Sequence, residues 1–137
     1  MDGKNEYLLI FRGKEWWRGL SPEELRNTME LIKGWFDRLT ESGELKAAQP
    51  LVREGALVSG RNGSVVADGP FAESKEVIGG YAVLKVNSLD DAIAIARSCP
   101  TLKFGMQAEV RPVAEECPML AYARRVILEE QFATASA

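Results

Sequence analysis

The sequence predicts a single α+β domain in which two helices cover one face of a sheet. Short runs of strand-favouring residues alternate with two segments that carry helical start signals, and two strands are apolar on both sides. The length of 137 residues suits one domain, and a composition of 46% hydrophobic and 27% charged residues is typical of globular proteins. We therefore expect the chain to fold by itself around one core.

The first half of this pattern is a strand followed by a well-marked helix. Residues 7–11 form a short apolar run rich in strand-favouring side chains. A helix is predicted to begin at Pro22, because Ser21 can cap it and Glu24 can complete a capping box. Its apolar residues recur at steps of four and three, which predicts one stripe that ends before Gly43. The stripe comprises Leu25, Met29, Ile32, Phe36 and Leu39.

Short strands and a second helix are predicted farther along the chain. The strands comprise residues 45–52, 56–59, 64–67 and 81–86. Asn62 and Gly63 predict a hairpin turn, since both residues tolerate a positive φ. Ser88 is expected to cap the second helix, which Pro100 prevents from continuing. The apolar face of that helix comprises Leu89, Ala92, Ile93 and Ala96.

With a last strand at residues 108–113, the order of elements is the split βαβ pattern of a ferredoxin-like sheet with an added hairpin. Two helices can cover only one face of such a sheet. Tyr81 and Val83 nevertheless give their strand a second apolar face, which face-to-face self-association would cover. A third predicted helix, residues 118–132, could supply part of that cover instead. We divide the chain into a domain at 1–116 and a C-terminal helix and tail at 117–137.

Charge and motif content exclude several classes of partner. The net charge is only −3 and the basic residues are scattered, which disfavours nucleic acid. The N-terminus is polar and no run of about 18 apolar residues occurs, so we expect a cytoplasmic protein without membrane contact. The two cysteines lack the spacing of a zinc or redox motif, and no phosphate-binding glycine loop is present. We therefore expect no metal and no cofactor.

The most unusual segment is residues 68–76. Asp68 precedes a Gly-Pro pair and can accept hydrogen bonds from the following backbone amides, while Phe71 can anchor the loop in the core. This pattern is typical both of a rigid structural turn and of a binding loop, and the sequence leaves both interpretations open. Asp68 and Glu73 are weak candidates for an acid or a base, and Lys75 is a candidate contact for a ligand.

This segment also carries a family resemblance. Asp-Gly-Pro-Phe at 68–71, continued by Ala-Glu-Ser-Lys-Glu and by Gly-Gly-Tyr at 79–81, resembles the signature of the YCII-related family, DGPF-domain subgroup. Gly-Trp-Phe-Asp-Arg-Leu at 34–39, Ser-Leu-Asp-Asp-Ala at 88–92 and Glu-Val-Arg-Pro-Val at 109–113 extend the resemblance. It begins with Tyr-Leu-Leu at residue 7 and ends at about residue 114.

The resemblance implies a ferredoxin-like fold that dimerises as an α+β barrel, a bacterial source, and an association with sigma factors of the extracytoplasmic-function type. Enzymatic relatives resemble one another in a His and Asp pair near the first helix, whereas this chain has no histidine. A general base would therefore need a carboxylate with a raised pKa or a lysine with a lowered pKa. This departure disfavours catalysis.

Two further features bear on a binding site. Glu109 and Arg111 are two residues apart on a strand, so both are expected to face the interior of the implied barrel. Arg111 could hold a carboxylate or phosphate there, but an ion pair that satisfies both charges is the favoured interpretation. Trp35 could line a pocket with Tyr81, although an aromatic residue at this position more often belongs to the core.

Our leading hypothesis is a homodimeric protein that binds a small anionic molecule in a barrel-side pocket. The residues expected nearest that molecule are Asp68, Phe71, Lys75, Tyr81 and Arg111. The first alternative is an enzyme that acts on a small organic acid, with Asp68 or Glu73 as the acid or base. The second is an interaction protein that contacts a sigma factor through exposed Trp16 and Trp17 and the C-terminal helix.

Overall fold

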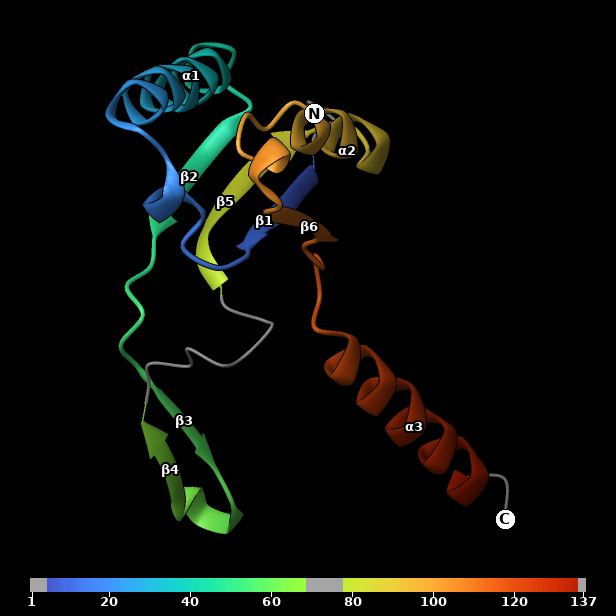
Figure 1. Cartoon of the computed structure of the whole chain (residues 1–137). Helices are drawn as coiled ribbons and strands as arrows, with labels where there is room; N and C mark the ends of the chain where they lie inside the picture. The colour runs from blue at the N-terminus through green and yellow to red at the C-terminus, as the bar shows by residue number, and fades with distance from the viewer. Residues whose placement is uncertain (1–4, 69–77, 136–137) are drawn as a thin grey trace.

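The computed structural model describes residues 5–68 and 78–135 (Figure 1). The strands are β1 (Asn5–Arg12), β2 (Leu45–Pro50), β3 (Ala56–Ser59), β4 (Val65–Asp68), β5 (Ile78–Val86) and β6 (Gln107–Pro112). The α-helices are α1 (Pro22–Glu41), α2 (Leu89–Arg97) and α3 (Pro118–Ala135). Short 3-10 helices lie at η1 (Trp16–Gly19), η2 (Arg61–Gly63) and η3 (Leu102–Phe104).

α1 begins and ends as the sequence predicts. The Ser21 hydroxyl accepts a hydrogen bond from the Glu24 amide at 3.1 Å, and the Glu24 carboxylate accepts one from the Ser21 amide at 3.0 Å. These two bonds complete the capping box, and the one from the Ser21 amide is the main cause that holds the pKa of Glu24 below its ordinary value. After Glu41 the chain turns at Gly43, whose φ of 79° favours glycine.

The second helix and the hairpin turn also follow their local sequence. The Ser88 hydroxyl accepts a hydrogen bond from the Asp91 amide at 3.1 Å and so caps α2. Asn62 and Gly63 have φ values of 61° and 69°, the left-handed conformation that a tight turn between two strands requires. Both predictions are confirmed.

The main sheet has the strand order β2-β5-β1-β6, and each neighbouring pair is antiparallel. Because α1 follows β1 and α2 follows β5, this is the ferredoxin-like arrangement of the split βαβ pattern. β3 and β4 pair with each other and form the added hairpin. The predicted α+β fold class is therefore confirmed.

The core lies between one face of this sheet and the helices. Leu9 is paired with Ala82, and both are fully buried, as is Leu84 in the next row. α1 lies nearest β2, whereas α2 lies against β1, β5 and β6. Trp35 is buried in this core, where its ring nitrogen donates to the Ser98 hydroxyl at 2.8 Å. The core interpretation of Trp35 is confirmed.

The predicted apolar faces of the helices are only partly right. In α1, Leu39 is buried, but Met29 is 60% exposed because it borders a cavity rather than the sheet, and Thr28 is buried nearby. In α2, Ala92 and Ala96 are buried, whereas the predicted Leu89 and Ile93 are exposed. Small alanine side chains let the backbone of α2 approach the sheet closely, which centres its buried face on them.

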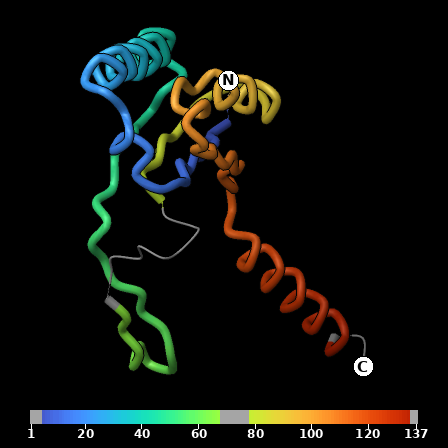
Figure 2. The backbone as a smooth tube through the Cα atoms, in the orientation of Figure 1, coloured from blue at the N-terminus to red at the C-terminus, as the bar shows by residue number. Residues whose placement is uncertain are grey.

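The other face of the sheet is uncovered. Leu8, Ile10, Tyr81 and Val83 share this face by strand alternation and register, and each is half-buried. Within residues 5–68 and 78–135 no helix lies over it, because α3 and the β3–β4 hairpin extend away from the sheet (Figures 1 and 2). The sequence allowed α3 to cover this face, and in the described chain it does not. None of the described helices is long and apolar enough to span a membrane.

Candidate ligand-binding cavity

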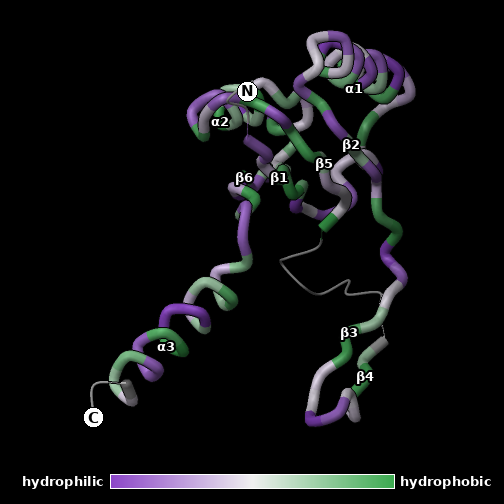
Figure 3. The backbone as a smooth tube through the Cα atoms, turned by 180° about the vertical axis from the view of Figure 1, so that it is seen from behind, coloured by the Kyte–Doolittle hydropathy of each residue, from purple (hydrophilic) through white to green (hydrophobic). Residues whose placement is uncertain are grey.

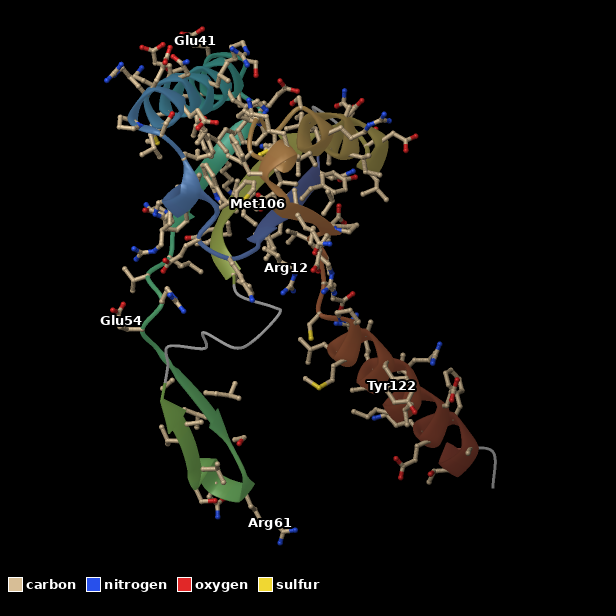
Figure 4. The ribbon with its side chains drawn as sticks, viewed as in Figure 1. Arg12, Glu41, Glu54, Arg61, Met106 and Tyr122 are labelled. Atoms are coloured by element: carbon tan, nitrogen blue, oxygen red, sulfur yellow. The ribbon has the colours of Figure 1, made fainter. Side chains whose placement is uncertain are left out.

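A cavity of about 930 Å³ lies between α1 and the β2 side of the sheet. Its volume is within the range of small-molecule sites, and most of its surface is apolar. The large apolar and aromatic side chains that line it are Phe11, Trp16, Trp17, Met29, Ile32, Phe36, Leu51, Ile78 and Met106. Met106 lies within the body of the molecule in Figure 4, close to the sheet.

Two glycines shape the wall of this cavity. A Cβ atom on Gly80 would lie 2.9 Å from the backbone oxygen of Gln49, so only glycine lets β2 and β5 approach this closely. Gly13 has a φ of 153°, and a Cβ there would lie 3.2 Å from Cγ of Met106. At both positions backbone, not a side chain, faces the space beneath α1.

The segment that follows β1 supplies an aromatic wall. Trp16 stacks on Phe104, with ring centroids 5.2 Å apart and an interplanar angle of 7°. Trp17 contacts Trp16 edge to face and is 46% exposed. The sigma-factor hypothesis expected both indoles to be exposed; Trp17 is exposed, whereas Trp16 is half-buried. Phe104 therefore fixes the orientation of Trp16, one of the two indoles that border the cavity.

Charged groups gather at one side of the cavity. The Glu15 carboxylate accepts hydrogen bonds from Arg18 and, at 2.6 Å, from Nη1 of Arg53. This network ties the segment after β1 to the connection between β2 and β3. Lys14 also lines the cavity, and it forms no ion pair with any residue that the structure describes. Lys14 is thus the cation best placed to meet an anionic group of a ligand.

Of the ligand contacts predicted from sequence, Tyr81 borders the cavity. Its pairing with Ile10 places it on the uncovered face of the sheet, as the sequence predicted. Arg111 is paired with Leu8 on that same face, is 67% exposed in its side chain, and does not line the cavity. The structure therefore places Tyr81 and Arg111 on one face but does not join them in one cavity.

The ion pair expected for Arg111 is present, with a third member that the sequence did not indicate. Arg111 lies 3.5 Å from Oε2 of Glu109, whose other oxygen accepts a hydrogen bond from Nε of Arg12 at 2.7 Å. The hydrogen bond from Arg12 is the main cause that holds the pKa of Glu109 below its ordinary value, and Arg111 adds to it. Arg12 lies on β1, so strand pairing, not sequence spacing, brings it to Glu109.

The remaining predicted residues lie at the end of β4 and after it. Asp68 ends β4, where its backbone pairs with Ala56 at the base of the hairpin. Phe71, Glu73 and Lys75 lie outside the described residues. The roles suggested for these four side chains stay predictions.

Sequence reasoning missed most of the cavity. Met29, Ile32 and Phe36 were recognised as an apolar stripe, and helical spacing does not distinguish a stripe that packs on a sheet from one that lines a cavity. Lys14 and Met106 carry no local signal, because each reaches the cavity only through the folding of the sheet. Among the residues with a described position, no group of three or more His, Cys, Asp or Glu side chains is arranged to hold a metal ion.

These features define a class: a ferredoxin-like α+β protein with an apolar cavity beneath its first helix. The chain belongs to the YCII-related family, because residues 6–128 match the YCII-related domain. That match reaches into α3. The chain is also 33% identical over 98 residues to an uncharacterised protein of Rhizobium meliloti strain 1021, with 69% of this chain and 79% of that protein covered.

Two solved structures are similar at low sequence identity. One is 5-chloro-2-hydroxyhydroquinone dehydrochlorinase from Burkholderia phenoliruptrix AC1100, solved in complex with 2,5-dihydroxybenzoquinone. It is 12% identical, has a TM-score of 0.43, and the match covers 81% of this chain and 95% of that one. The other is hydroxynitrile lyase from Passiflora edulis, 16% identical with a TM-score of 0.36, covering 86% of this chain and 100% of that one.

Proposed function

We propose that the chain binds a small molecule with an apolar, partly aromatic body and one acidic group in the cavity beneath α1. The observation that carries this proposal is the composition of the cavity: aromatic and methionine side chains form its walls, and Lys14 lies at its side. Concave apolar sites with a few polar groups are the usual form of small-molecule sites. This arrangement supports the expectation of an anionic ligand. Lys14, rather than the Arg111 expected from the sequence, would be the cation that contacts its acidic group.

The apolar walls dominate the expected affinity. A ligand that buries roughly 200 Å² of apolar surface gains about 5 kcal/mol before the costs of association are subtracted. An ion pair with the exposed Lys14 contributes at most about 1 kcal/mol. The shape and hydrophobicity of the ligand body therefore govern binding, and the cation selects among bodies of similar shape.

A matched pair of fluorescent probes tests the proposal. We expect two probes to bind the folded chain. One is 1-anilinonaphthalene-8-sulfonate, which has an aromatic body and a sulfonate, and the other is its uncharged analogue N-phenyl-1-naphthylamine. Met29→Glu places a carboxylate in the cavity wall and should weaken both probes at least about fivefold, by the cost of burying an unpaired charge. Leu31→Glu alters an exposed neighbour on α1 that does not line the cavity, and should change neither affinity.

The role of the cation is tested separately. Lys14→Gln should weaken the sulfonate probe about fivefold and leave the uncharged probe unaffected, since only one of the two carries a charge for the lysine to meet. Lys33→Gln, at an exposed position of α1 where Lys33 pairs with Asp37 2.6 Å away, is the control. Equal affinities of the sulfonate probe for wild type, Met29→Glu and Lys14→Gln would contradict the proposal.

Ligand binding is favoured over catalysis because the described carboxylate in the cavity wall, that of Glu15, is already held by two arginines. Arg18 and Arg53 both donate hydrogen bonds to Glu15 and occupy its two oxygens. The enzyme hypothesis would depend on Asp68 or Glu73 and stays a prediction. Its test is a screen of small organic acids for turnover with the Asp68→Ala and Glu73→Ala variants alongside.

We also propose that the chain forms a homodimer through the uncovered face of the sheet, as an α+β barrel. Support comes from the half-buried Leu8, Ile10, Tyr81 and Val83, an apolar strip that a second copy would remove from water. Contact with a sigma factor through Trp16 and Trp17 is less favoured, because both indoles line the cavity and Trp16 is already stacked on Phe104. Leu8→Asp should convert the dimer to single copies in sedimentation equilibrium.

We further propose that the protein is bacterial and cytoplasmic and that it belongs to the DGPF subgroup of the family. The relative in Rhizobium meliloti supports the bacterial source, and Asp-Gly-Pro-Phe at 68–71 supports the subgroup. Cell fractionation with an antibody against the chain would test the location.

A further inference from the structure

Two segments, the β3–β4 hairpin and α3, extend from the rest of the fold. We call these two segments the arms, and the four-stranded sheet with α1 and α2 the body. The hairpin (β3, η2 and β4) follows β2, which is one edge of the sheet, and α3 follows β6, which is the other edge. Both extend from the side of the sheet that α1 and α2 leave uncovered (Figures 1 and 2). Arg61 at the tip of the hairpin and Tyr122 on α3 lie far from the body and from each other in Figure 4.

The arms expose apolar side chains that a water-soluble monomer would cover. Figure 3 shows apolar stretches along both of them. The hairpin exposes apolar residues on both of its faces, because Leu57 and Val65 lie on one face and Val58 and Val66 on the other. The large apolar residues exposed on α3 are Met119, Leu120, Tyr122, Val126, Ile127, Leu128 and Phe132.

Neither arm has a stable form by itself. A two-stranded hairpin alone in water is marginally stable and needs a further strand or a helix against it. A single helix of 18 residues likewise depends on packing of its apolar side chains. In the described part of the chain, neither α3 nor the hairpin packs extensively on the body or on the other arm. Each arm therefore has the apolar surface that the other requires, but within one copy the two arms do not pack on each other.

The exposed area is large enough for a second copy to be the missing partner. The chain exposes 10301 Å². A compact monomer of 15.1 kDa exposes about 7,100 Å², so the excess is about 3,200 Å². A stable interface of standard size removes only about 800 Å² per partner, and permanent dimers remove considerably more.

We propose that α3 of each copy packs against the β3–β4 hairpin of a second copy, so that the two copies exchange arms. This inference rests on the homodimer proposed above and adds a second contact to it. The arms leave opposite edges and opposite ends of the sheet, so a two-fold axis along the strands brings α3 of one copy to the edge from which the partner's hairpin leaves, one strand length away along the axis. α3 is about 27 Å long, whereas facing sheets lie about 10 Å apart, so the helix reaches beyond the partner's sheet.

Charge substitutions in the arms test this contact in the full chain. Ile127→Asp in α3 and Val66→Asp in the hairpin are exposed in a single copy and buried in the exchanged pair. Each should weaken dimerisation at least tenfold in sedimentation equilibrium, because each buries an unpaired carboxylate. Gln131→Asp and Ser64→Asp introduce the same charge at polar positions of the same arms, and should have little effect. Unchanged dimerisation in both arm variants would overturn the inference.

Disulfide trapping gives an independent readout. In a Cys117→Ser background, one preparation carries Tyr122→Cys on α3 and the other carries Val58→Cys on the hairpin. After the two preparations are mixed and oxidised, we expect the dominant product to be a disulfide between unlike copies. Its absence from a mixture that still contains dimers would refute the exchange of arms.

The two proposals can fail separately. Loss of the dimer in Leu8→Asp together with full retention in Ile127→Asp and Val66→Asp would leave the sheet-face homodimer standing and overturn the exchange of arms. A wild-type chain that stays a single copy at high concentration would overturn both. Probe binding in the cavity is measured independently of either result.

Discussion

The body of the molecule and its two arms differ in how their apolar side chains are covered. In the body, Leu9, Ala82 and Leu84 are fully buried between the sheet and the helices. In the arms, residues of the same chemical type, such as Val66 and Ile127, are exposed although the backbone is equally regular. Local sequence propensity therefore forms the helices and strands of both regions. The regions differ in whether long-range packing buries their apolar side chains. These exposed, regular elements are where we propose that a second copy packs.

The largest expected effect is at the centre of the body. Leu84→Ala removes a fully buried side chain and should lower the free energy of unfolding by about 2–5 kcal/mol, through lost burial and the cavity left behind. Ile127→Ala in α3 is the matched change in an arm. At concentrations that populate single copies it should cost no more than about 0.5 kcal/mol in a urea titration. Similar losses for the two variants would remove the distinction between body and arms.

The next effect is at the wall of the cavity. Gly80→Ala places a methyl group 2.9 Å from the backbone oxygen of Gln49, which cannot move without separating β2 from β5. We expect a loss of about 1–3 kcal/mol in thermal unfolding, together with altered probe affinity. Gly19→Ala is the control, because its Cβ would meet no atom within 4 Å. A stable Gly80→Ala variant with normal probe binding would show that the glycine does not set the cavity wall.

The smallest expected effect concerns Glu109, on the uncovered face of the sheet, and the dependence of stability on pH. The pKa of Glu109 is lowered, chiefly by the hydrogen bond from Arg12, so its folded value lies below its unfolded value. Its contribution is present above the unfolded value, near 4.5, and is lost as the pH falls through the folded value. Glu109→Gln should therefore reduce the loss of stability on acidification below about pH 4.5, measured by urea titrations. An unchanged acid slope in Glu109→Gln would contradict this account.

The sequence predicted the architecture because the signals for it are local. Ser21 and Glu24 specify the start of α1 through bonds three residues apart, and Asn62 and Gly63 specify the hairpin turn. The two-faced character of β5 follows from simple alternation at Tyr81 and its neighbours. These features need no knowledge of which elements lie side by side, so they can be read from a single chain.

The candidate site could not be predicted in the same way. Its members come from β1 and the segment after it, α1, β2 and the connection after it, β5 and the loop before β6. No spacing along the chain relates Lys14 to Met106. The salt bridge between Arg12 and Glu109 has the same origin, since the two residues are 97 positions apart. Met29 shows the limit most clearly: its helical periodicity predicted an apolar contact, but not that the contact would be with an open space.

Strand β5 places neighbouring residues in two different environments. Gly80 faces the space beneath α1, whereas Tyr81 lies on the uncovered face of the sheet and also borders the cavity. Inserting one residue at this point would exchange the two assignments, with a bulky ring directed under α1 and a glycine directed outward. Length changes at this point would thus alter the proposed ligand site and the proposed dimer face together.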